Sequence, residues 1–145
     1  MTFRRILCAV DLLQDSPRTF QIAAEIARQF RQSLKVLHVI EALPNVPELP
    51  PVRNLSGMVV NVEEKAMAAM QVLIKSSAED LDGITLSMEI DTGEPFVEIL
   101  NHARRWKADL IVLGSKGTTT LEEVFVGRTA EHVTREAPCS VLIVR

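Results

Sequence analysis

The sequence predicts an α/β fold: an open five-stranded parallel sheet, doubly wound in the order βαβαβαβαβ, with helices on both faces. Three observations lead to this prediction. The chain has 145 residues, the length of one ordinary domain, so residues 1–145 are expected to form a single unit. Short apolar runs alternate with segments of helical periodicity along the whole chain. Such alternation favours a parallel sheet, because each strand reaches the next through a helix packed on a sheet face.

The first half of the chain supplies two strands and two helices. Residues 5–10 form an apolar run that ends at Asp11. Ser16-Pro17 provides an expected N-cap and a first-turn proline, and apolar residues at helical spacing follow it. A second strand is predicted over 34–40. After a proline-rich loop, a second helix is indicated that ends near Gly83, with an apolar side at Val62, Ala66, Ala69, Met70 and Leu73.

The second half supplies the remaining three strands and two helices. Residues 84–90 alternate strictly between apolar and polar and are predicted to form the third strand. Gly93-Glu94-Pro95 then turns the chain into a helix with apolar positions at Phe96, Ile99, Leu100 and Ala103. The fourth strand is expected over 110–113. Gly127 opens the last helix, and residues 141–144 form the fifth strand.

The third and fifth strands differ in a way that predicts their places in the sheet. One face of the third strand is polar and should meet solvent, so this strand belongs at an edge. The fifth strand should be the other edge, yet it is apolar on both faces. Because an exposed edge of that kind invites pairing, we expect a homodimer through strand five, although a helix or loop of the same chain is the alternative cover. The residues concerned are Val141, Leu142, Ile143 and Val144.

Composition excludes several classes of function. Lys plus Arg is 16 and Asp plus Glu is 19, a net charge of −3, so a nucleic-acid partner bound through a basic face is not expected. The apolar stretch from Ile6 to Val10 is too short for a signal peptide or a membrane span, so no membrane partner is expected. Cys8 and Cys139 have no paired spacing and suit packed, reduced thiols in a cytoplasmic protein.

A candidate ligand site follows from the fold, because ligands of doubly wound sheets bind beyond the carboxyl ends of the strands. Asp11 follows the first strand, and segment 114–129 follows the fourth. Gly114 and Gly117 allow a close approach of the backbone, and Gly127 lies at a helix N-terminus that favours phosphate. Positive charge and hydroxyl donors are added by Lys116, Arg128 and Thr118 to Thr120. The segment therefore suits a polyphosphate.

At this point the sequence resembles the universal stress protein family over essentially its whole length. The resemblance includes the strand ending in Val10-Asp11, the strand containing Val36-Leu37-His38-Val39, and the Gly93-Glu94-Pro95 turn. It also includes the final stretch 137–144. The most specific match is Gly114-x-x-Gly117, nine further residues and then Gly127, which is similar to the family's ATP-binding pattern.

The resemblance implies a small cytoplasmic dimer that acts as an ATP-binding regulator of the stress response. The adenine nucleotide would be ATP, with or without Mg²⁺. Its dimer contact carries over to strand five. The nucleotide-binding residues that carry over are Val10, Asp11, Val39, Gly114, Lys116, Gly117, Gly127 and the residue after it, with Thr129 one place later.

One position departs from the family pattern. The residue after Gly127 should be Ser or Thr, and here it is Arg128. Three interpretations stay open: Arg128 binds phosphate, fills the pocket, or points to solvent. The loop 12–15 also lacks the Gly-Ser that often follows the family's aspartate. The alternative function is therefore a stress-protein dimer that binds no nucleotide and acts through protein partners, with Arg128 disrupting the ATP site.

No enzyme class is indicated, and no catalytic residue is assigned. The sequence contains no Gly-x-Gly-x-x-Gly after the first strand, no P-loop and no Gly-x-Ser-x-Gly. Slow ATP hydrolysis is the most that is expected, with Asp11 and Glu122 or Glu123 as its only candidates. The histidines lack metal-ligand spacing, so no metal site is expected. His38 is expected to be a hydrogen-bonded structural residue, and His102 and His132 are expected on helix surfaces.

Overall fold

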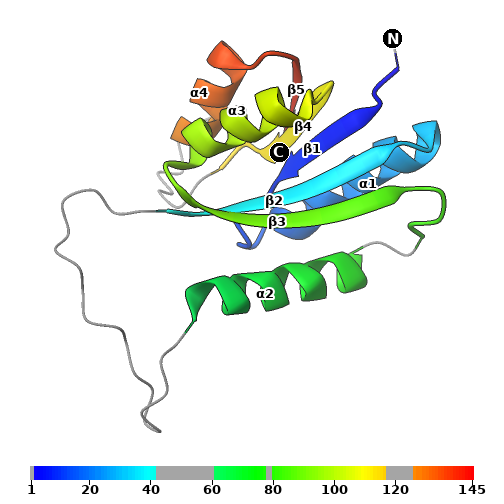
Figure 1. Ribbon diagram of the computed structural model, residues 1–145, viewed down its shortest axis with the longest axis horizontal. Coiled ribbons are helices and arrows are strands. Elements are labelled where there is room, and N and C mark those ends of the chain that lie inside the picture. Colours follow the sequence, from blue (N-terminus) through cyan, green and yellow to red (C-terminus); the bar gives the residue numbers. More distant parts are fainter. Residues whose placement is uncertain (1, 42–60, 78–79, 117–125) are drawn as a thin grey trace, which may run out of the picture.

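The computed structural model describes residues 2–41, 61–77, 80–116 and 126–145, which form one parallel sheet covered on both faces by helices (Figure 1). This confirms the predicted α/β fold. The elements in chain order are β1 (Arg5–Ala9), α1 (Ser16–Phe30), β2 (Ser33–Glu41), α2 (Val62–Ser77), β3 (Thr85–Gly93), α3 (Pro95–Trp106), β4 (Leu110–Gly114), α4 (Arg128–Glu136) and β5 (Ser140–Val144).

The strand order is β3-β2-β1-β4-β5, and all four pairings are parallel. The chain therefore winds outward from β1 to β3, returns to the other side of β1 and winds outward again to β5. The order reverses between β1 and β4, where Ile6 pairs with Leu110 and Ala9 with Leu113. Both predicted edge strands are at the edges.

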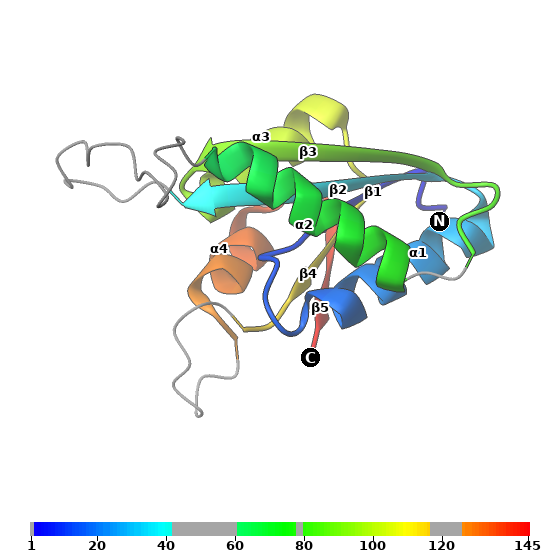
Figure 2. The same ribbon diagram turned by 90° about the horizontal axis from the view of Figure 1, so that it is seen from below.

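Two apolar layers hold the helices to the sheet. Phe20 of α1 and Met70 of α2 are fully buried against one face, which also carries Leu34 and Val36. The opposite face carries Leu7 and Leu37 and is covered by α3 and α4. Figure 2, seen from below, shows α1 and α2 in front of the sheet. Cys8 lies at the centre of the sheet, and burial raises the pKa of its thiol to about 12, as suits a packed, unreactive cysteine.

The structure corrects three local predictions. Ser16 is the first residue of α1 and not its N-cap; that place belongs to Asp15, which makes no side-chain cap. The third strand continues past Ile90 to Gly93, because β2 is long enough to pair with it up to Glu41. His102 is buried, with 7% of its surface exposed, and does not lie on the surface of its helix. None of the helices in the described part of the chain combines the length and hydropathy that a membrane crossing needs.

Candidate functional site

A cavity of about 580 Å³ opens beyond the carboxyl ends of β1, β2 and β4, where the strand order reverses. Its volume lies within the range of pockets that bind small molecules. Gly117, Thr118 to Thr120, Glu122 and Glu123 lie outside the described residues. The predicted nucleotide-binding residues that the structure describes all line this cavity: Val10, Asp11, Val39, Gly114, Lys116, Gly127, Arg128 and Thr129.

One wall of the cavity is apolar. Val10 and Val39 are buried at the ends of neighbouring strands, and Ile99 of α3 and Leu113 of β4 line the same space. The N–H of Val10 donates to the carbonyl oxygen of Leu37 at 2.9 Å, which extends the pairing of β1 with β2 to the cavity mouth. A flat apolar group such as a nucleobase is the kind of ligand that such a wall accommodates.

Asp11 holds the loop that leads from β1 into α1. Its Oδ1 accepts hydrogen bonds from the N–H of Leu13 and the hydroxyl of Ser16, both at 2.9 Å. Between Asp11 and Leu13, Leu12 adopts a left-handed conformation with φ of 62°, which is uncommon for a residue with a bulky side chain. The carboxylate thus organises a tight turn at the cavity wall where the family often has Gly-Ser.

The two ends of segment 114–129 are brought together by backbone hydrogen bonds. The N–H of Ser115 donates to the carbonyl of Val144 at 2.9 Å, and the N–H of Gly127 donates to the carbonyl of Ser115. Gly127 is the N-cap residue of α4 and has no side chain with which to cap it. The first-turn N–H groups of α4 therefore keep their capacity to bind an anion in the cavity.

Charged residues of both signs surround the cavity mouth. Lys116 and Arg128 line it, and Lys65 of α2 adds a third cation that the sequence analysis did not identify. The guanidinium of Arg128 lies 3.7 Å from Oε1 of Glu94, and 72% of the Arg128 side chain is exposed. Arg128 therefore lies at the rim and does not fill the cavity.

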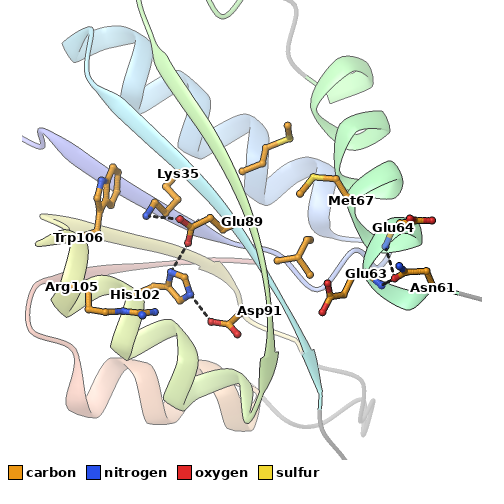
Figure 3. Close-up of a pocket in the computed structure, with 12 residues that line it drawn as sticks. Lys35, Asn61, Glu63, Glu64, Met67, Glu89, Asp91, His102, Arg105 and Trp106 are labelled. Atoms are coloured by element: carbon orange, nitrogen blue, oxygen red, sulfur yellow. Dashed lines mark hydrogen bonds and ion pairs between the residues drawn. The ribbon is translucent and has the colours of Figure 1, made fainter.

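A second polar cluster lies between β3 and α3, away from this cavity. Figure 3 shows His102 between two carboxylates: its Nδ1 is 2.9 Å from Glu89 Oε2, and its Nε2 is 2.9 Å from Asp91 Oδ2. Lys35 reaches the other oxygen of Glu89 at 3.3 Å. These side chains border a second cavity of about 800 Å³, which lies away from the reversal of strand order.

Polar contacts explain how His102 can be buried. Each of its ring nitrogens lies 2.9 Å from a carboxylate oxygen, so both polar atoms of the buried ring have a partner. The hydrogen bond from His102 is the largest of the contacts that lower the pKa of Asp91 below its ordinary value, followed by the N–H of Thr92. The other predicted surface histidine, His132, stacks on Phe96 with 4.3 Å between ring centroids.

Comparison with known proteins gives consistent results. The sequence model of the universal stress protein family matches residues 2–145. A universal stress protein of Methanocaldococcus jannaschii is 31% identical over 143 residues, which span 99% of this chain and 82% of the relative. The solved structure of UspA from Lactobacillus plantarum superposes with a TM-score of 0.84 at 31% identity and covers 100% of this chain and 99% of its own.

Two further solved structures contain nucleotides. A universal stress protein in complex with cAMP matches with a TM-score of 0.73 at 18% identity, over 100% of this chain and 99% of that one. The universal stress protein of Archaeoglobus fulgidus in complex with dAMP matches with a TM-score of 0.64 at 21% identity, over the full length of both chains. At these identities the similarity establishes the shared fold.

Proposed function

Since this chain belongs to the universal stress protein family, we propose that it binds an adenine nucleotide, ATP foremost, in the cavity beside Asp11 and acts as a cytoplasmic stress-response regulator and not as an enzyme. The observation that carries this proposal is the convergence of an apolar wall and an anion-binding end in one cavity. Structures of the same fold in complex with cAMP and dAMP support the choice of an adenine nucleotide.

The two ends of the cavity would bind different parts of the nucleotide. The adenine would lie against Val10 and Val39, with the carboxylate of Asp11 within reach of the sugar hydroxyls. The phosphates would lie at Gly114, Lys116, Gly117 and Gly127, where the α4 N-terminus and lysine supply positive potential. The first-turn residues Arg128 and Thr129 complete this end. ATP would bind with or without Mg²⁺.

The role of Arg128 decides between nucleotide binding and the alternative, a dimer that acts only through protein partners. We propose that Arg128 exchanges its exposed contact with Glu94 for the phosphates. A guanidinium binds phosphate more strongly than it binds an exposed carboxylate at 3.7 Å, and the cavity behind it is open.

The first test is calorimetric titration of ATP into protein freed of any co-purified small molecule, which is identified by mass after denaturation. Wild type should bind ATP stoichiometrically, and Arg128→Ser should bind it about 10-fold more weakly while adenosine binding is unchanged. Arg135→Ser, which removes an exposed arginine from the far end of the same helix, is the matched control. Tighter ATP binding by Arg128→Ser would show that Arg128 blocks the site, and no binding by either protein would leave the partner-binding dimer.

The functional unit that we propose is a homodimer joined through β5. Within the described residues β5 pairs with β4 alone, so its outer edge has unpaired backbone groups. Val141, Leu142 and Ile143 are each only partly buried. A second copy that pairs there would cover this apolar edge, and light scattering would report twice the mass of one chain.

A further inference from the structure

The cluster between β3 and α3 contains three side chains of the kinds that bind metal ions. Asp91 comes from β3, and Glu98 and His102 lie one turn apart on α3, so that both project from the same side of that helix. One ligand atom from each residue lies within 4.8 Å of the others. The three ligands come from two different elements, a strand and a helix, so their spacing in the sequence does not form a recognisable metal-binding motif.

His102 is held as a metal-binding histidine is usually held. Its side chain is 8% exposed, and Glu89 accepts from Nδ1 at 2.9 Å. Lys35 Nζ donates to the other carboxylate oxygen of Glu89, Oε1, at 3.3 Å. A carboxylate on one ring nitrogen fixes the ring and directs the other nitrogen at the metal, which is the common outer-shell arrangement of metal-bound histidines. Nε2 of His102 faces Asp91 in this way (Figure 3).

Glu98 reaches the cluster because residue 93 is glycine. A Cβ at Gly93 would lie 3.0 Å from Cγ and 3.2 Å from Oε1 of Glu98, so any larger residue would push that carboxylate aside. Gly93 is the last residue of β3 and follows Asp91 by two positions on the same strand. The backbone thus leaves room for the third ligand at the place where it is needed.

The local charge favours a cation. Three carboxylates, those of Glu89, Asp91 and Glu98, meet there, and their contacts within the described residues are with the ammonium of Lys35 and the ring of His102. A bound divalent ion would neutralise the excess negative charge. The 800 Å³ cavity borders both Asp91 and His102 and gives an ion a path from solvent.

We propose that Asp91, Glu98 and His102 form a binding site for a divalent transition-metal ion, for which Zn²⁺ fits best. One imidazole nitrogen with two carboxylate oxygens suits Zn²⁺, whereas Mg²⁺ and Ca²⁺ select all-oxygen sites. Two ligand atoms about 2.1 Å from a tetrahedral Zn²⁺ are roughly 3.4 Å apart, so the 2.9 Å contact between Nε2 and Oδ2 needs to open by only about 0.5 Å to admit the ion. The ion would take the place of that hydrogen bond, with Glu89 retained on Nδ1. This site is separate from the nucleotide cavity and does not depend on it.

The experiment is calorimetric titration of Zn²⁺ into the full chain after removal of metals with a chelator. Wild type should bind one Zn²⁺ per chain, and Glu98→Gln should weaken binding at least 10-fold by removing a charged ligand at the helix surface. His102→Gln should abolish it, and Glu89→Gln should weaken it about 10-fold by releasing the ring. Circular dichroism checks that each variant is folded, and the conclusion rests on Glu98→Gln if His102→Gln is not.

His132→Gln is the matched control, because His132 is a helix histidine stacked on Phe96 and outside the cluster. It should bind Zn²⁺ as wild type does. The proposal is overturned if wild type binds no Zn²⁺, if Glu98→Gln binds it unchanged, or if His132→Gln loses it equally. Equal binding of Mg²⁺ would overturn the choice of a transition metal.

Discussion

The two edge strands of the sheet, β3 and β5, differ in the side chains that they present. β3 carries Glu89 and Asp91 on one face, and α3 meets these charges with His102. β5 is apolar at four consecutive positions and ends the sheet without a charged side chain between Val141 and Val144. Charged residues discourage pairing with another chain, whereas a continuous apolar edge favours it. The comparison teaches that β3 is covered by its own chain, whereas the apolar edge of β5 suits the pairing with a second copy that we propose.

The largest expected effect comes from placing a charge on the apolar edge. Ile143→Lys should weaken the proposed dimer by about 3 kcal/mol, roughly a hundredfold in its dissociation constant, because the ammonium would lose its water at the interface. Thr85→Lys, at an exposed position of β3, is the control and should leave the dimer intact. Light scattering at several concentrations measures the effect. A wild-type monomer, or a dimer that Thr85→Lys breaks, would contradict the comparison.

The second effect comes from breaking the charged edge. His102→Ala leaves Glu89 and Asp91 without their shared partner, and we expect the free energy of unfolding to fall by about 2 kcal/mol. The two carboxylates are partly exposed, so the loss should be smaller than for a fully buried ion pair. Urea unfolding in the presence of a chelator measures it. The proposed dimer should persist in His102→Ala. If this variant were both less stable and monomeric, the two edges of the sheet would not be independent.

A smaller effect tests the outer end of the same network. Lys35 Nζ lies 4.9 Å from the centroid of the Trp106 ring, and 12% of the lysine side chain is exposed. A double-mutant cycle with Lys35→Met and Trp106→Leu should give a coupling energy of about 0.5–1 kcal/mol. Urea unfolding of the four proteins, followed by circular dichroism, measures this energy. A coupling near zero would mean that Lys35 acts on the β3 edge through Glu89 alone.

The smallest effect should stabilise the helix that protects β3. Lys107 ends α3 in a left-handed conformation with φ of 54°, which glycine adopts without strain. Lys107→Gly should therefore raise the free energy of unfolding by about 0.5 kcal/mol, and thermal unfolding measures it. Lys75→Gly, inside α2, should instead lower it by about 1 kcal/mol. The same sign for both variants would contradict the conformational explanation.

The sequence predicts the edges and the cavity because both depend on local pattern and topology. Alternation in residues 84–90 and its absence in 141–144 suffice to place two strands, and polar residues after strand ends must meet near the reversal of order. Asp11, Gly114 and Gly127 were predicted in this way, whereas Val10 came from the family resemblance, and all four line the cavity. Lys65, which also lines the cavity, was not predicted, because the position of α2 over the cavity depends on packing between helices that are distant in the sequence.

His102 shows where sequence reasoning failed. It follows Ile99 by three residues and precedes Ala103, so its position on the inward side of α3 was visible in the spacing. Its partners were not visible, because Glu89 was assigned to a solvent-facing side of the third strand and Asp91 lay beyond the predicted end of that strand at Ile90. The packing of α3 against that face brings His102 into contact with both carboxylates, and these contacts allow the histidine to be buried.

The place of Trp106 has an optical consequence. The chain contains one tryptophan and no tyrosine, so its near-ultraviolet fluorescence comes from a single ring. That ring lies under the ammonium of Lys35, at the end of the contacts that run through Glu89 to His102. The emission spectrum of the unlabelled protein therefore reports on the charged edge of the sheet, and a change there can be followed in solution without attaching a dye.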